Sequence, residues 1–290
     1  MAIELVRAMP EHIPQMARIT YEAFKGIADA HNFPTDIPDV NVASMFIEML
    51  VTRPDFYGVA AVEDGVVLGH NFVQISDPVA AVGPICVEPN RQAKGVGRHL
   101  MQHIVEWSLK NHGPMVRLLQ EGYNMRSLSL YAALGFVVRE PVVLMEVIPA
   151  SKPDSTTRAL TAADLDACDA LCQKVQKASR KNELAAAIQF GPAMGCVPFG
   201  RFVGGPLKAF IVPGFFGFSA AVSDDELLDV MQEAARLSPP PLHRTLMPTR
   251  QGTLFPAAMR RGFRSIKPFN TMSIGPYETP RGAWTPSIGY

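Results

Sequence analysis

The chain of 290 residues is poor in cysteine, carries no excess of charge of either sign and has no long apolar run. Lys plus Arg and Asp plus Glu number 27 each, so no overall field attracts nucleic acid or an anionic membrane. The four cysteines form no Cys-x-x-Cys pair and have no histidines near them at zinc spacing, which argues against a metal site. We therefore predict that Cys86, Cys168, Cys172 and Cys196 are reduced and buried.

Nothing in the sequence predicts a membrane segment or a secretion signal. The longest apolar stretch, residues 209–222, is too short to cross a bilayer and is interrupted by Pro213 and Gly214. The first residues include an acidic side chain where a signal peptide needs an apolar run. We expect a soluble, cytoplasmic protein, with no nucleic-acid and no membrane partner, whose length suits about two domains.

The most informative segment leads from a short apolar strand into a long amphipathic helix. Between them, after Val87-Glu88-Pro89, stands Gln92-Ala93-Lys94-Gly95-Val96-Gly97-Arg98. The first N–H groups of a helix lack partners inside it, and the helix dipole favours negative charge at that end. Glycine lets a ligand approach the backbone, and Lys94 and Arg98 add two cations. The pattern predicts a phosphate-binding loop.

The glycine spacing narrows the choice of ligand. Gly95-x-Gly97 lacks the third glycine of the dinucleotide fingerprint and the Lys-Ser/Thr pair of a P-loop. Read as Gln92-x-x-Gly95-x-Gly97 after Val87-x-Pro89, the loop resembles the acetyl-CoA pyrophosphate loop of the GNAT superfamily of N-acetyltransferases.

A second motif supports the same resemblance. It reads Asn124-Met125-Arg126-Ser127-Leu128-Ser129-Leu130-Tyr131-Ala132-Ala133-Leu134-Gly135-Phe136. Asn124 is expected to cap a helix with one apolar side, and Gly135 to end that helix before a strand. The resemblance covers residues 3–147.

The resemblance implies a cofactor site and a catalytic acid. Acetyl-CoA would be held by Ile85, Val87, Gln92, Ala93, Lys94, Gly95, Val96, Gly97, Arg98, Asn124 and Ser127. Backbone groups of the strand at Ile85–Val87 would bind the pantetheine arm and polarise the thioester carbonyl. Tyr131 would protonate the departing thiolate, and a core aromatic is the alternative interpretation of Tyr131. Cys86 lies on the same strand, where we expect it to be core.

The general base is not evident. Many relatives have a glutamate four positions before the valine of Val-x-Pro, and here that position is Gly83, so a bound water, another residue or a neutral amine would have to serve. The other candidates are Asp77, Glu121, His31 and Asp36. A further hypothesis places the C-terminal carboxylate of Tyr290 in the active site, and an edge clasp for the second domain is the alternative for this tail.

The hydrophobic pattern predicts two similar halves. The first half is expected to contain strands at 6–8, 57–62, 66–75, 79–87, 115–120 and 136–148 and helices at 11–24, 41–51, 99–110 and around Tyr131. The second is expected to contain strands at 215–222 and 244–247, helices at 224–237 and 253–261, and a last strand after Gly262-Phe263.

We therefore predict an α/β (α+β) fold of two GNAT-like domains, each with a mixed, mostly antiparallel twisted sheet flanked by helices. Residues 1–149 would be the catalytic domain and 157–290 a degenerate copy with an extended, packed tail. The copy has an acidic Ser-Asp-Asp-Glu segment at residues 223–226 in place of the glycine loop, and Ala258 in place of the tyrosine.

The predicted function is transfer of an acetyl group from acetyl-CoA to a primary amine of a small molecule, directly in a ternary complex and without a metal. Two alternatives remain: a non-catalytic acyl-CoA-binding or regulatory module, and an acyltransferase for a longer acyl-CoA. Aromatic residues of the second half would form either core or a homodimer surface: Phe199, Phe202, Phe210, Phe215, Phe216 and Phe218.

Overall fold

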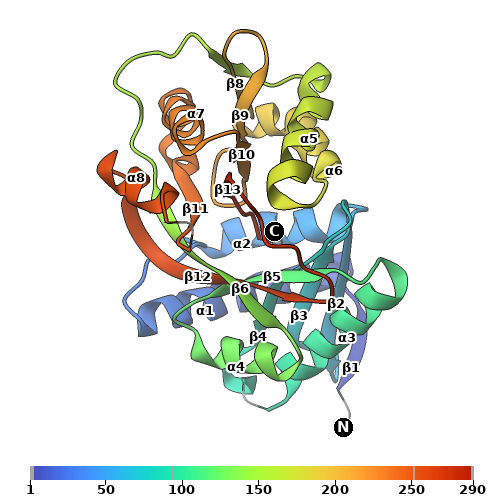
Figure 1. Ribbon diagram of the computed structural model, residues 1–290. Helices are drawn as coiled ribbons and strands as arrows, with labels where there is room; N and C mark the ends of the chain where they lie inside the picture. The colour runs from blue at the N-terminus through green and yellow to red at the C-terminus, as the bar shows by residue number, and fades with distance from the viewer. Residues whose placement is uncertain (1–2, 93, 251, 289–290) are drawn as a thin grey trace. The chain divides into compact units, whose positions relative to one another are not determined.

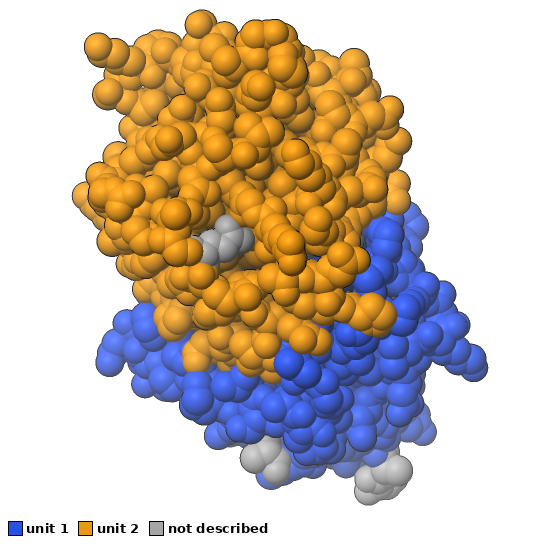
Figure 2. All heavy atoms as spheres, in the orientation of Figure 1, with its two compact units in different colours: residues 1–118, 123–137, 273–275 blue, residues 119–122, 138–272, 276–290 orange. Residues whose placement is uncertain are grey.

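The computed structural model describes residues 3–92, 94–250 and 252–288 (Figure 1). Contacts within the chain divide it into two compact units, coloured separately in Figure 2. Unit 1 comprises residues 1–118, 123–137 and 273–275, and unit 2 comprises residues 119–122, 138–272 and 276–290.

Unit 1 is built on an antiparallel sheet. Its strands are β1 (Glu4–Arg7), β2 (Phe56–Glu63), β3 (Val66–Gln74) and β4 (Ala80–Val87), each paired with the next. β5 (Val116–Glu121) starts parallel to β4, with residues 80–82 opposite residues 116–118. Asp64 (φ 53°) and Gly65 (φ 76°) form the predicted turn between β2 and β3, where two left-handed residues are needed.

The helices of unit 1 cover both faces of this sheet. They are α1 (Ile13–Ala30), α2 (Val40–Thr52), α3 (Val96–Asn111) and α4 (Met125–Ala133). On the α1 side, Met16, Ile19 and Phe72 pack with Cys86, which is 2% exposed, so the core interpretation of Cys86 is confirmed. α1 runs six residues beyond the predicted end at Phe24, into a stretch expected to be irregular.

Unit 2 contains strands of two sheets. In one, β12 (Arg264–Ile274) lies between the last residues of β5 and β6 (Val137–Glu146), and β6 pairs with β11 (Arg244–Pro248). The other has the order β13 (Ala283–Thr285), β10 (Ser219–Ala221), β9 (Leu207–Ile211), β8 (Phe199–Phe202) and β7 (Thr157–Ala159). The helices are α5 (Leu165–Gln176), α6 (Lys181–Phe190), α7 (Asp224–Leu237) and α8 (Leu254–Arg260). Short 3-10 helices occur along the whole chain at Pro10–His12, Pro89–Arg91, Ala162–Asp164, Gly191–Met194 and Pro240–Leu242.

The order of elements from β7 to β12 repeats the order from β1 to β6, which confirms the predicted fold class. The second repeat departs from the prediction at its fourth strand. β10 begins only at Ser219, because Gly214 (φ 96°) and a bond from the Gly217 N–H to the Gly214 carbonyl form a turn first. α5, α6, β8 and β9 were not predicted from the sequence.

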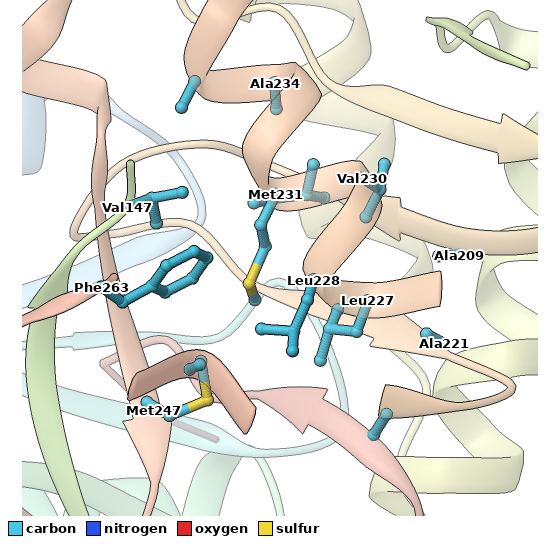
Figure 3. Packing of buried hydrophobic residues seen from close by; sticks show 14 of the residues in the cluster. Val147, Ala209, Ala221, Leu227, Leu228, Val230, Met231, Ala234, Met247 and Phe263 are labelled. Atoms are coloured by element: carbon cyan, nitrogen blue, oxygen red, sulfur yellow. The ribbon is translucent and has the colours of Figure 1, made fainter. Parts of the chain in front are cut away.

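The core of unit 2 gathers between α7 and the strands beside it. Figure 3 shows Leu228 and Met231 of α7 directed toward Phe263 and Met247. Each of these side chains is at most 2% exposed. Of the aromatic residues whose role the sequence left open, three are core: Phe199, Phe210 and Phe218.

Candidate functional site

Hydrogen bonds at the end of β4 show which of its backbone groups face β3 and which face the opposite edge. The Glu88 N–H donates to the Leu68 carbonyl of β3 at 2.9 Å. Backbone groups alternate in direction along a strand, so Cys86 also directs its N–H and C=O toward β3. Ile85 and Val87 therefore direct theirs to the opposite edge.

A cluster of N–H donors follows at the start of α3. Gly95 precedes the helix in a left-handed conformation (φ 90°, ψ −14°), which glycine adopts without strain. Its carbonyl accepts the first helical bond, from the His99 N–H at 3.0 Å. The N–H groups of residues 96–98 thus lie outside the helical ladder, and no described side chain caps them. The result is a row of donors at the positive end of the helix dipole.

Gly97 lies where β4, α3 and α4 meet. A Cβ atom on this glycine would stand 3.5 Å from Val87 Cγ2 and 3.6 Å from Leu130 Cδ2, both ordinary contact distances. The protein's own packing therefore leaves room for a methyl group at Gly97. The two motifs found in the sequence meet at this point of unit 1.

Some of the charged side chains around the loop form ion pairs, and two cations do not. Arg18 of α1 holds Glu88 at 2.5 Å, and this contact raises the pKa of Arg18. Arg91 lies 3.2 Å from Glu63. Lys94 and Arg98 are exposed, and neither forms an ion pair with a described residue. The carboxylate beside the loop is thus neutralised, while two cations remain for an anion.

Gln92 is held from two sides. Its Nε2 donates to the Val87 carbonyl at 3.3 Å, and its Oε1 accepts from Arg126 Nη1 at 2.7 Å. This chain of bonds joins the end of β4, the loop and the second residue of α4. Sequence reasoning missed Arg126, whose only signal was a cation inside the second motif.

The second motif folds as the sequence predicts. Asn124 caps α4, its side chain accepting from the Ser127 N–H at 3.1 Å. Ser127 Oγ donates to the Asn124 carbonyl at 2.9 Å, so both side chains shape the start of the helix. Tyr131 lies one helical turn further on, 8% exposed, with its ring 6.1 Å from that of Phe136. Gly135 (φ 94°) ends the helix as expected.

An aromatic group lies next to Asn124. The ring of Tyr123 stacks on Phe33 at a centroid distance of 4.5 Å and an angle of 23°, and lies 5.2 Å from the ring of His31. His31 and Phe33 belong to the connection between α1 and α2. The His31 Nδ1 is 2.9 Å from the Ile27 carbonyl, so a ring protonated on Nδ1 keeps the Nε2 lone pair available.

The other candidate bases are engaged elsewhere. Gly83 offers no side chain and forms a cis peptide bond with Pro84. Asp77 is 4% exposed. Within unit 2, Glu121 accepts from Lys267 at 3.1 Å. Asp36 forms an interaction with another part of the chain. Ala93 of the loop and the carboxylate of Tyr290 lie outside the described residues.

Comparison with known proteins agrees with this geometry. Residues 17–136 match the model of the acetyltransferase (GNAT) family. This part of the chain is therefore similar to a GNAT acetyltransferase domain. The matched residues take in both motifs, so the resemblance found in the sequence is confirmed.

Solved structures extend the fold match to the whole chain. A proposed acetyltransferase from Pyrococcus horikoshii is 17% identical, with a TM-score of 0.72 over 99% of this chain and 94% of its own. A tandem GNAT protein from the clavulanic acid biosynthesis pathway is 13% identical, with a TM-score of 0.59 over 96% and 100%. A GCN5-related N-acetyltransferase from Sphaerobacter thermophilus is 14% identical, with a TM-score of 0.62 over 97% of both chains. No curated protein matched.

No helix among the described residues has the length and apolar character needed to cross a membrane. They contain no group of three or more His, Cys, Asp or Glu side chains that could hold a metal ion.

Proposed function

We propose that this protein transfers an acetyl group from acetyl-CoA to a primary amine of a small molecule, and that unit 1 carries the site. The observation that supports this most strongly is that an outward-facing strand edge is followed directly by a row of N–H groups outside the helical ladder. The outward edge at Ile85 and Val87 leads through the loop to the N–H groups of residues 96–98. An extended arm followed by a pyrophosphate matches that sequence of donors.

The residues fit the donor substrate group by group. Backbone groups of Ile85 and Val87 would hold the pantetheine arm. The N–H groups of residues 96–98, with Lys94 and Arg98, would hold the pyrophosphate. Asn124 and Ser127 would fix the start of α4 beside the arm. We assign Gln92 mainly to bracing the loop, because both ends of its amide are engaged by Val87 and Arg126.

The reaction needs one proton removed and one delivered. The amine nitrogen bonds to the acetyl carbon, the carbon–sulfur bond breaks, and the amine loses a proton. We assign Tyr131 as the acid that protonates the thiolate sulfur. We assign His31 as the base, acting through Nε2, since Tyr123 positions its ring beside Asn124. The aromatic faces of Phe33 and Tyr123 suit the cationic form of an arriving amine.

Two alternatives make different predictions. A module that only binds acyl-CoA would not need Tyr131, which is buried about two turns after the Asn124 cap. A longer acyl group is favoured by the absence of a side chain at Gly83 on the same strand. The acyl group and the amine should therefore be varied in the same experiment.

The test is a turnover screen that measures free thiol released from acetyl-, propionyl- and succinyl-CoA with a panel of primary amines. We expect turnover with acetyl-CoA, lost in Tyr131→Phe and reduced in His31→Gln. Phe190→Tyr, an exposed aromatic in unit 2, is the matched control and should retain full activity. Binding of acetyl-CoA without turnover for any amine would favour the non-catalytic module.

A further inference from the structure

In the second repeat, the end of β10 corresponds to the end of β4 in the first. The Val222 N–H donates to the Lys208 carbonyl of β9 at 2.8 Å, as the Glu88 N–H does to β3 in the first repeat. The same alternation therefore applies, and Ala220 directs its backbone groups toward β9. Ser219 and Ala221 direct theirs to the opposite edge.

These two residues correspond to the pair assigned to the pantetheine arm. Counting back from the bonded N–H, Ala221 takes the place of Val87 and Ser219 the place of Ile85. In the first repeat, β4 pairs with β5 only before this point, over residues 80–82. In the second repeat, the edge is covered by the chain itself.

The covering segment is β13. It pairs antiparallel with β10, Thr285 opposite Ser219 and Ala283 opposite Ala221 (Figure 1). Trp284, between them, is 1% exposed and belongs to the core of unit 2. β13 therefore lies where an extended arm would lie in an intact site.

Side chains of α5 hold the tail in place. Gln176 Nε2 donates to the Ser219 carbonyl at 3.0 Å and to the Thr285 carbonyl at 3.3 Å. The hydroxyls of Ser219 and Thr285 are 2.7 Å apart. The Arg281 N–H donates to the Val175 carbonyl at 2.8 Å. The tail is thus held by contacts from β10, from β13 itself and from α5.

The start of α7 is also unsuited to binding an anion. Ser223 caps the helix, its Oγ accepting from the Glu226 N–H at 3.4 Å. Asp224 and Asp225 follow directly, so this helix start repels an anion where α3 attracts one. Both halves of an acyl-CoA site, the edge and the anion pocket, are absent together.

We propose that β13 is a permanent internal substitute for the pantetheine arm, so that unit 2 takes no acyl-CoA and the chain binds one molecule. This inference rests on the proposed function in assigning the β4 edge to the arm. It explains why a repeat that lost its loop remains stably folded, because the open strand edge has an intramolecular partner.

The test is amide hydrogen exchange in the wild-type protein, followed residue by residue with and without acetyl-CoA. We expect the amides of Ser219 and Ala221 to be protected in both states. The amides of Ile85 and Val87 should be unprotected at first and gain protection with acetyl-CoA. Calorimetric titration should give one acetyl-CoA per chain.

A backbone variant shows what provides the protection. Ala283→Pro removes an N–H that faces β10, and we expect exchange at residues 219 and 221 to become at least ~100-fold faster while amides of β2 and β3 keep their rates. Ala283→Ser keeps the N–H and is the matched control.

Four results would overturn the proposal: fast exchange at residues 219 and 221 in the wild type, new protection there on adding acetyl-CoA, a stoichiometry of two, or unchanged exchange at these amides in a folded Ala283→Pro protein. A complete lack of acetyl-CoA binding would instead refute the proposed function. The ligand-free exchange rates would still decide whether β13 closes the edge.

Discussion

Arg126 donates through Nη1 to Gln92 Oε1 at 2.7 Å, joining residues 34 positions apart in the chain. Gln92 passes the connection on through its Nε2 to the Val87 carbonyl at the end of β4. The loop that we assign to the pyrophosphate is therefore braced against both neighbouring elements in the free protein. Preorganisation of this kind lowers the ordering cost of binding.

The first prediction concerns this brace. Gln92→Ala and Arg126→Ala should each weaken acetyl-CoA binding about fivefold to tenfold, on the order of 1 kcal/mol, because each leaves the loop less ordered. The double variant should be little worse than either single one, since both remove the same interaction. Lys110→Ala, an exposed cation at the far end of α3, is the control. Fully additive losses in the double-mutant cycle would contradict a shared brace.

The second prediction separates ligand approach from protein packing at Gly97. Gly97→Ala should leave the melting temperature unchanged or raise it, because the added methyl makes only ordinary contacts and alanine favours the helix by up to about 1 kcal/mol. Acetyl-CoA affinity should fall at least ~10-fold, since the methyl would occupy the path of a phosphate. Scanning calorimetry and titration of the same sample measure both. Unchanged affinity would place the phosphate elsewhere.

The third prediction concerns Tyr131. Tyr131→Phe removes one hydroxyl and should lower kcat by on the order of 100-fold, as loss of a general acid does. The dissociation constant for acetyl-CoA should stay within about twofold, because the ring and the helix remain. Single-turnover measurements with an acetyl thioester of a thiol of lower pKa should recover most of the rate, because that thiolate leaves without a proton. Equal loss of rate with both thioesters would indicate a structural role instead.

The fourth prediction concerns His70 on β3. This side chain is fully buried, with Nε2 3.0 Å from Thr20 Oγ1, and burial lowers its pKa from 6.5 to about 3. The unfolded chain takes up this proton near pH 6.5 and the folded one does not. The neutral histidine is thus compatible with full stability above pH 6.5, and stability is lost as the pH falls toward 3.

Between pH 6.5 and 5 this loss should amount to about 2 kcal/mol, at about 1.4 kcal/mol per pH unit. Urea unfolding at several pH values measures it. His70→Gln should flatten the curve in this range, whatever its stability at pH 7. A wild-type curve that is already flat would show that the folded protein accepts the proton.

Local rules accounted for most of the first repeat and for α7, whose ends are those predicted. The Asn124 cap, the Asp64–Gly65 turn and the Gly135 helix end follow from side-chain or backbone preferences of single residues. Candidate site residues could be named because the predicted phosphate loop depends on local spacing.

Long-range pairing could not be predicted. The position of β13 on β10 depends on residues 283–285 finding an edge more than 60 positions earlier, which no local pattern records. The position of β12 beside β6 likewise depends on pairing between distant residues. Arg126 was overlooked because its partner, Gln92, comes into reach only when α4 packs beside the loop.

The most direct test of the central claim is isothermal titration of acetyl-CoA into the wild type and into Gly95→Asp/Gly97→Asp. Gly26→Asp/Gly113→Asp, at two sites with open space around the glycine, is the matched control. We predict one site with a dissociation constant on the order of micromolar in the wild type and the control, and no measurable binding in the loop variant. Absence of binding to the wild type, or binding that survives the loop variant, would contradict the account.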